Sequence, residues 1–192
     1  VSGHYSVELY TSTDVLLATK ALLVEEFMPD RIKVKANLDK KDYKPGEKLN
    51  LSIEAVNYFG PPASGRNYES ELQLKERAFN SKAFSNYNFS LSQSDSYYET
   101  MLSEGATDEE GKGKEAFEIP AYYKDRGILQ ADVFTTVFDE NGRPVSRATS
   151  APIYTQQVFY GIKNDGYGYY QLNQPVRFNL VALNKDDKPF AS

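Results

Sequence analysis

Apolar and polar residues alternate with a period of two along much of this chain. Between residues 32 and 38, every second position is apolar, and lysine or asparagine fills the positions between. The same alternation recurs at 49–55, 71–75, 131–136 and 178–182. Side chains two residues apart point to the same face of a β-strand, so each run has one apolar and one wetter face. We therefore predict half-buried antiparallel strands at these positions.

Turn-forming residues separate these runs. Residues 42–47 carry a Pro-Gly pair, the order that a type II turn favours at its two central positions. Residues 140–143 contain Asn-Gly between two runs, which is the strongest short hairpin signal. We predict a further turn at 185–189. The segment 59–65 contains two prolines, each lacking a backbone donor, so we exclude it from a central strand.

The least regular stretch is 79–113, which is rich in Ser, Asn and acidic residues. We expect a long insertion or mobile loop there, with room for one short strand or one turn of helix. No segment of the chain has a convincing helical pattern over three turns. The chain as a whole is predicted to be all-β and to fold as an antiparallel β-sandwich.

The chain also resembles itself at a long offset. The segment around Leu9 resembles the segment around Val133, which lies 124 residues later. The segment around Leu51 resembles that around Phe178, which lies 127 residues later. Two nearly equal offsets predict tandem domains of about 125 residues, with one complete copy in the middle.

This repeat suggests a domain organisation. Residues 1–27 would be the C-terminal strands of a preceding domain, residues 28–153 a complete sandwich, and residues 154–192 the N-terminal strands of a following domain. Residues 25–30 would form the linker, where Pro29 ends strand pairing. The alternative is that residues 1–27 add strands to one larger sandwich.

The chain begins at Val1 within a strand pattern, without Met or a signal-like segment, so we expect a piece excised from a longer protein. Incomplete sandwiches would expose an apolar sheet face and open edges. Our hypothesis is that the truncated ends complement each other by strand exchange, within one chain or between two.

Composition narrows the functional class. The 22 Lys and Arg residues against 27 Asp and Glu give a net charge of −5, which argues against a dedicated nucleic-acid binder. No run of 18 apolar residues occurs, so we expect no membrane-spanning helix. The chain has no Cys, which removes disulfides, thiol catalysis and Cys-ligated metal centres. With 15 Tyr, 11 Phe and no Trp, we expect a core rich in Tyr and Phe.

Few residues could carry out chemistry. His4 is the single histidine, so a catalytic triad or a multi-histidine metal site would have to use it. We expect it to be a solvated residue at the start of a strand. No carboxylate lies in the apolar setting that a glycosidase acid requires. We therefore assign no catalytic, cofactor-binding or metal-ligating residue, and we expect neither a cofactor nor enzymatic activity.

Two clusters have alternative interpretations. Acidic residues after position 103 could bind calcium, but they lack alternating spacing and lysines follow closely, so we expect a solvated loop. Tyrosines after position 153 could form a platform for a sugar or peptide, whereas we expect them to pack in a domain interface or in the core of a following domain. The acidic residues are Glu104, Asp108, Glu109 and Glu110; the tyrosines are Tyr154, Tyr160, Tyr167, Tyr169 and Tyr170, near Gly161, Gly166 and Gly168.

Several segments resemble the macroglobulin domains of the bacterial alpha-2-macroglobulin family. Residues 24–34 look like the junction between successive macroglobulin domains, and residues 43–47 are similar to the turn between their first two strands. Residues 55–65 look like their second strand and the aromatic and glycine-containing loop after it, and residues 139–145 fit their late hairpin. Each motif is common in sandwiches; the resemblance depends on their order over residues 24–153.

This resemblance implies a fibronectin/immunoglobulin-like macroglobulin domain of seven strands within a broad-spectrum endopeptidase inhibitor. In that family a protease cleaves a bait region, the domains rearrange and the protease is enclosed. The implied partners are neighbouring macroglobulin domains and, through the full-length parent, target proteases. The implied location is the periplasm or the bacterial cell envelope. The family's thioester requires Cys and cannot lie in this chain. We expect 79–113 to be an insertion in a scaffold domain rather than the bait region.

Two other functions remain open at this point. The chain could be a repeated β-sandwich module of a surface adhesin or carbohydrate-binding protein, in which the tyrosine rings would be exposed and coplanar. It could also be an accessory domain of a secreted hydrolase whose catalytic module lies elsewhere.

Overall fold

The structure is a computed structural model that describes residues 3–24, 31–90, 98–166 and 170–190. All the regular secondary structure within these ranges consists of β-strands, as the alternation predicts. The chain divides into two compact units, residues 1–31 and residues 32–192.

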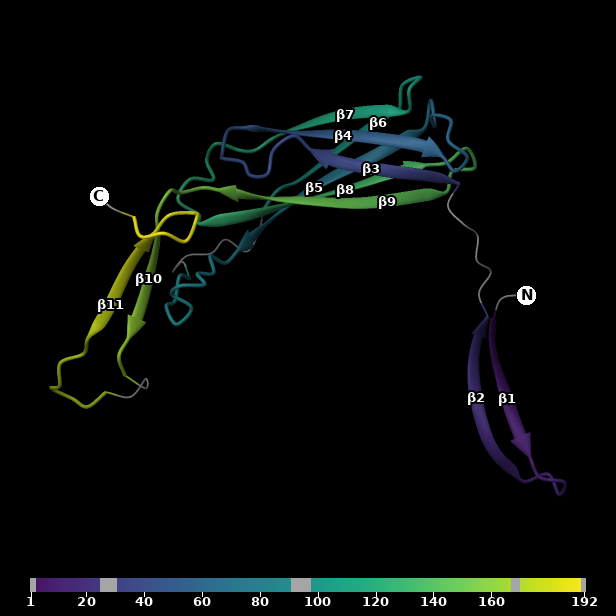
Figure 1. Cartoon of the computed structure of the whole chain (residues 1–192), viewed down its shortest axis with the longest axis horizontal. Helices are drawn as coiled ribbons and strands as arrows, with labels where there is room; N and C mark the ends of the chain where they lie inside the picture. The colour runs from purple at the N-terminus through teal and green to yellow at the C-terminus, as the bar shows by residue number, and fades with distance from the viewer. Residues whose placement is uncertain (1–2, 25–30, 91–97, 167–169, 191–192) are drawn as a thin grey trace. The chain divides into compact units, whose positions relative to one another are not determined.

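The larger unit contains a sandwich of two antiparallel sheets (Figure 1). One sheet has the strand order β3 (Ile32–Leu38), β4 (Lys48–Asn57) and β7 (Lys112–Glu118). The other has the order β6 (Thr100–Ala106), β5 (Asn67–Arg77), β8 (Ile128–Phe138) and β9 (Pro144–Tyr154). The predicted all-β sandwich is confirmed, with the three-plus-four division of a fibronectin-like fold.

The predicted alternation decides which side chains enter the core. The apolar positions at the start of β3 and along β4 are buried, whereas the polar residues between them are exposed. One buried cluster joins both sheets. It is mainly aliphatic and includes Phe117, Tyr43, Tyr68 and Tyr123 as its aromatic members. The expectation of a Tyr- and Phe-rich core is therefore wrong for the sandwich, because many other described aromatic residues lie at its surface or on the end hairpins.

The predicted turns form, each with its own geometry. The N–H of Glu47 donates to the carbonyl of Lys44 at 3.1 Å, and Gly46 has a φ of 84°, as a type II turn requires. At the Asn-Gly pair, Gly142 has a φ of 75° and its N–H donates to the carbonyl of Asp139 at 3.0 Å. This is a three-residue hairpin loop that ends in a left-handed glycine.

The irregular stretch is narrower than the predicted 79–113. β6 lies entirely within that range and pairs with β5 along its whole length, and β7 begins at Lys112. The irregular part is the connection between β5 and β6, of which residues 91–97 lie outside the described residues. The sequence allowed one short strand in this range but did not locate β6, because the inward positions of β6 are Met101, Ser103 and Gly105, which do not form an apolar run.

Each end of the chain forms a hairpin of its own. β1 (Gly3–Tyr10) pairs with β2 (Leu16–Val24) in the smaller unit, and β10 (Phe159–Asn164) pairs with β11 (Phe178–Leu183) in the larger unit. β11 and the turn after it reproduce β4 and its own following loop at an offset of 127 residues. The equivalent contacts are the hydrogen bonds Ala63 N–H to Ala55 O (3.0 Å) and Phe190 N–H to Ala182 O (2.8 Å), and the bridges Val56–Pro62 and Leu183–Pro189.

The β1–β2 hairpin reproduces the β8–β9 hairpin, but at an offset of 128 rather than the predicted 124. Each turn runs from one hydrogen-bonded residue to the other, over 11–15 and 139–143, and each hydrogen bond of one turn has its equivalent in the other. The structure therefore matches Leu9 with Val137 instead of Val133. The sequence alignment was four residues short because a pattern with a period of two matches itself at every even shift. The equivalent bonds are Thr11 N–H to Val15 O with Asp139 N–H to Arg143 O (both 2.9 Å), and Asp14 N–H to Thr11 O with Gly142 N–H to Asp139 O (3.1 and 3.0 Å).

Candidate functional site

One face of the β10–β11 hairpin exposes apolar side chains at positions whose counterparts in the sandwich are buried. Phe178 and Leu180 are 56% and 76% exposed, whereas the counterparts Leu51 and Ile53 are each 2% exposed. Tyr160, on the same face, is 72% exposed. We call this face, which consists of Tyr160, Ile162, Phe178 and Leu180, the inner face. Its pattern is that of a core surface without its covering layer.

The β1–β2 hairpin has the same property. Val7 and Leu9 are exposed, whereas their counterparts Thr135 and Val137 in β8 are buried. Both hairpins thus carry the side-chain pattern of a sandwich sheet without the opposing sheet that a two-layer fold supplies.

The connection from the sandwich to β10 is fixed by hydrogen bonds. Thr155 is buried; its hydroxyl donates to the carbonyl of Gly127 at 3.0 Å and accepts the N–H of Arg126 at 2.7 Å. The side chain of Gln156 accepts the N–H of Gly127 at 3.1 Å and donates to the carbonyl of Val158 at 2.8 Å. The hairpin is therefore joined by a structured connection rather than by a free tether.

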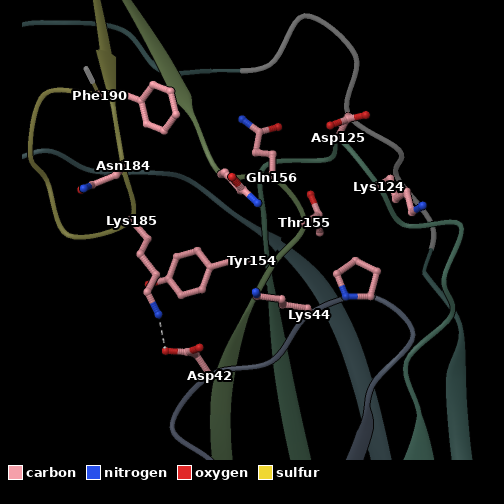
Figure 2. Close-up of a pocket in the computed structure, with 12 residues that line it drawn as sticks. Asp42, Lys44, Lys124, Asp125, Tyr154, Thr155, Gln156, Asn184, Lys185 and Phe190 are labelled. Atoms are coloured by element: carbon pink, nitrogen blue, oxygen red, sulfur yellow. Dashed lines mark hydrogen bonds and ion pairs between the residues drawn. The ribbon is translucent and has the colours of Figure 1, made fainter. Parts of the chain in front are cut away.

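A cleft of about 490 Å³ lies where loops of the sandwich meet the turn after β11 (Figure 2). Lys185 reaches into it, pairs with Asp42 at 2.9 Å, and lies 5.3 Å from the ring centre of Tyr154. The hydrogen bond to Asp42 raises the pKa of Lys185. An exposed ion pair contributes at most about 1 kcal/mol, so this pair orients the turn more than it stabilises it.

The loop that carries Asp42 is anchored by Tyr43, which is fully buried. Its N–H donates to the carbonyl of Pro152 at 3.0 Å, and its carbonyl accepts the N–H of Tyr154 at 2.9 Å. Its hydroxyl donates to Asp39 at 2.6 Å. Burial and, next, this hydrogen bond raise the pKa of Tyr43 to about 12. One wall of the cleft is thereby fixed to β9.

Residues 79–90, which begin the connection between β5 and β6, lie beside β10 (Figure 1). Phe79 stacks on the buried Phe159 with ring centres 4.3 Å apart and planes at 4°. Asn88 and Ile162 exchange two backbone hydrogen bonds, of 2.8 and 2.9 Å. This segment is therefore attached to the hairpin by packing and by backbone pairing.

Asp187 makes a further attachment from the turn after β11. Its carboxylate accepts the N–H groups of Lys82 at 2.8 Å and Ala83 at 3.3 Å. A hydrogen bond from the Ser81 hydroxyl, followed by these backbone donors, lowers the pKa of Asp187.

The residues that the sequence raised as chemical candidates do not converge. His4 is exposed on β1 opposite Leu23. Asp108 accepts the N–H groups of Glu110 and Lys112, and so closes the turn between β6 and β7. Within the described ranges, no group of three or more His, Cys, Asp or Glu residues is arranged to hold a metal ion.

The described tyrosines of the late cluster have different neighbours. Tyr154 lies against Lys185, Tyr160 belongs to the inner face, and Tyr170 accepts a hydrogen bond from Asn164 at 2.5 Å. Tyr167 and Tyr169 lie outside the described residues. The described rings therefore do not form one platform.

Sequence reasoning missed the residues that fix this junction. Asp42 and Lys185 are 143 residues apart in the sequence, and no local pattern predicts an ion pair between residues so far apart. One signal was available: Asn184 and Pro189 repeat the spacing of Asn57 and Pro62, and therefore mark the same turn in a second copy.

Comparison with known proteins identifies related sequences. The family described as "Bacterial Alpha-2-macroglobulin MG5 domain" matches residues 30–154. An alpha-2-macroglobulin of Pasteurella multocida (strain Pm70) is 27% identical over 169 residues. The match covers 84% of this chain but spans 9% of the length of that relative.

Solved structures of Escherichia coli alpha-2-macroglobulin are similar in fold. The native conformation matches with a TM-score of 0.65 and 19% identity, over 97% of this chain and 12% of that one. The form activated by porcine elastase matches with a TM-score of 0.67 and 20% identity, over 97% of this chain and 17% of that one.

A helix that could span a membrane is absent from the residues that the structure describes.

Proposed function

Because the chain belongs to the bacterial alpha-2-macroglobulin family, we propose that it is a structural part of a broad-spectrum endopeptidase inhibitor that traps proteases. The family match over residues 30–154 carries this proposal. Escherichia coli alpha-2-macroglobulin is described both in a native conformation and as activated by porcine elastase. We propose a comparable protease-triggered change for the parent of this chain, in which this part is a scaffold and performs no catalysis.

The proposed domain organisation follows the repeat. Residues 28–153 are a complete macroglobulin domain, preceded by the last strands of one domain in 1–27 and followed by the first strands of another in 154–192. The duplicated hydrogen bonds and the exposed inner face support this division. In the parent, the remaining strands of the following domain would cover the inner face.

Strand exchange between the ends is the corresponding proposal for the chain on its own. A β1–β2 hairpin would cover the inner face of β10–β11, within one chain or from a second copy. Light scattering of the purified chain over a range of concentrations tests exchange between copies. Loss of any dimer in Leu180→Glu supports it, and a concentration-independent monomer contradicts exchange between copies.

The partners and location follow from the proposed role. The chain would contact neighbouring macroglobulin domains of the same polypeptide, and it would meet target proteases through the full-length parent. We place the parent in the periplasm or elsewhere on the bacterial cell envelope, where foreign endopeptidases are encountered.

An inhibition assay on the full-length parent tests the protease-trap function. An enclosed protease loses access to large substrates, whereas small peptides still reach its active site. The parent should therefore suppress cleavage of a folded protein substrate by elastase far more than cleavage of a short chromogenic peptide. Equal suppression of both, or of neither, contradicts a trap. A parent with its bait region deleted is the matched control.

A further inference from the structure

The β10–β11 hairpin has a second apolar face, and here it differs from its counterpart in the sandwich. The face opposite the inner face consists of Phe159, Gly161, Val181 and Leu183, and we call it the outer face. Gly161 pairs with Val181 across the two strands. The offset of 127 makes Val181 the equivalent of Glu54, which pairs with Lys35 in an exposed ion pair at 3.6 Å.

At the next pair along, one of the two positions changes in the same way, since Leu183 corresponds to Val56, which is apolar in both copies. Phe159 pairs with Leu183 and occupies the position of Lys33 in β3. Lys33 is exposed, whereas Phe159 and Leu183 are 3% and 0% exposed. In one copy of the repeat Lys33, Lys35 and Glu54 make this face largely charged and face water; in the other, the face is apolar and covered. A change of this kind marks an interaction surface, because an uncovered apolar face carries a cost in water.

Residues 79–90 cover this outer face. The Phe79 ring stacks on Phe159, and the Phe89 ring lies edge-on to Phe79 with centres 5.0 Å apart. Phe89 also lies directly over Gly161: a Cβ at that position would be 2.6 Å from the Phe89 ring. A side chain at position 161 would therefore require the Phe89 ring to shift.

Backbone groups add direction to this packing. β10 pairs with β11 on one edge, and on the other its Ile162 exchanges two hydrogen bonds with Asn88. The Asp187 carboxylate accepts the N–H groups of Lys82 and Ala83 at the start of the same segment. Ring packing, backbone pairing and the hydrogen bonds to the Asp187 carboxylate thus all attach the same twelve-residue segment to the hairpin and its turn.

We infer that residues 79–90 are a bracket through which the sandwich holds the following domain, and that the apolar outer face of β10–β11 is the surface built to receive it. That the β10–β11 hairpin belongs to a following domain rests on the organisation proposed above. The docking of the bracket on the hairpin does not depend on that proposal. The irregular connection that the sequence marks as an insertion therefore has a mechanical role. A rearrangement that moves the following domain has to release this bracket.

Amide hydrogen exchange in the purified chain tests the bracket. The N–H of Ile162 donates to the carbonyl of Asn88, and the N–H of Asn88 donates to the carbonyl of Ile162. Exchange at these two N–H groups therefore reports directly whether the bracket is docked. The N–H of Phe190, bonded to Ala182, reports the turn after β11, and the N–H of Ala55, bonded to Gly111, reports the sandwich.

The test variant carries the outer-face residues of β3–β4: Phe159→Lys with Val181→Glu. The matched control is Tyr160→Lys with Leu180→Glu, which makes the same charge changes at adjacent, exposed positions. The test variant should speed exchange at Ile162 and Asn88 by about tenfold or more, whereas exchange at Ala55 stays slow. The control should leave Ile162 and Asn88 protected.

Phe79→Ala approaches the contact from the other side and leaves the hairpin sequence intact. It should also speed exchange at Ile162 and Asn88 while Phe190 stays protected. If the N–H of Ile162 exchanges as slowly in both variants as in the unmodified chain, the bracket does not hold the hairpin and the inference is overturned. Failure of the inhibition assay on the parent would leave this result untouched, because exchange is measured on the chain itself.

Discussion

The hydroxyl of Tyr68 on β5 donates a hydrogen bond to Glu115 on β7 at 2.7 Å, and so ties the four-stranded sheet to the three-stranded one. Glu115 also accepts the hydroxyl of Ser103 at 2.5 Å. Burial and, next, the bond to Glu115 raise the pKa of Tyr68 to about 12. The Tyr68–Glu115 bond is therefore a polar link between the two layers, beside the Ser103–Glu115 bond and the aliphatic core.

This link should make stability fall at alkaline pH. In the unfolded chain Tyr68 ionises near pH 10, whereas in the fold it stays neutral up to about pH 12. Its contribution is complete below pH 10 and is lost as pH rises towards 12. Tyr68→Phe should lower the free energy of unfolding by about 1–2 kcal/mol at pH 7 and flatten its decline above pH 10. Urea unfolding at pH 7, 10 and 11 measures both, and an unchanged alkaline slope contradicts the assignment.

The ring of Tyr68 also leaves no space for a side chain at Gly113 on β7. A Cβ there would be 2.6 Å from the ring, and the backbone needs no left-handed conformation. Gly113→Ala should therefore cost about 1–3 kcal/mol through overpacking. In the Tyr68→Ala background the same change should cost much less. A double-mutant cycle by chemical denaturation measures this coupling, and additive effects would show that the two positions do not interact.

Asp39 provides the acid-side counterpart. Hydrogen bonds from Tyr43 and, next, from Asn50 lower the pKa of Asp39. Its contribution to stability is present above the ordinary aspartate pKa, near 4, and is lost as pH falls through the lower folded value. Asp39→Asn should therefore make stability less dependent on pH below about 4. Thermal melts from pH 2 to 5 measure this, with Tyr43→Phe as a second variant that should act in the same direction. An unaltered pH profile in both would contradict the role given to this bond.

How far the sequence predicts this molecule depends on how regular each strand is. β3 and β4 could be predicted from alternation because one face meets the core and the other meets water. β6 could not, because Ser103 faces Glu115 and Gly105 makes room for Tyr68, so its inward face is not apolar. The repeat could be found, but its first offset was displaced by four residues until the turn beginning at Thr11 fixed the register.

The junction was harder to predict than the strands. Thr155 and Asp187 act by bonding to backbone N–H and C=O groups, and such contacts leave no pattern in the sequence. The bracket was visible only as a stretch that fits no strand. We inferred its function by comparing the pair Gly161–Val181 with the equivalent pair Lys35–Glu54. These pairs can be recognised only when the register between the strands is known.

The repeat also predicts how a leucine of the sandwich core and a leucine of the inner face respond to truncation. Leu51 is 2% exposed, so Leu51→Ala should cost about 2–5 kcal/mol. Leu180 corresponds to the core residue Ile53 but is 76% exposed, so Leu180→Ala should change stability by less than about 0.5 kcal/mol in this chain.

In a longer chain that includes the whole following domain, Leu180→Ala should become as costly as Leu51→Ala. Chemical denaturation of both variants in both chains gives the comparison. If Leu180→Ala stays neutral in the longer chain, the inner face is not the core of a following domain and the proposed domain organisation fails.

We propose that this chain is scaffold within a protease trap whose domains rearrange when a protease cleaves the trap. Sedimentation velocity of the full-length parent, before and after addition of elastase, measures this rearrangement. We predict a larger sedimentation coefficient with the active enzyme, because a compacted particle experiences less friction, beyond the increase expected from the mass of bound elastase. Elastase whose catalytic serine is blocked should give no such change. An unchanged coefficient for a parent that the active enzyme has cleaved would show that cleavage does not rearrange the domains.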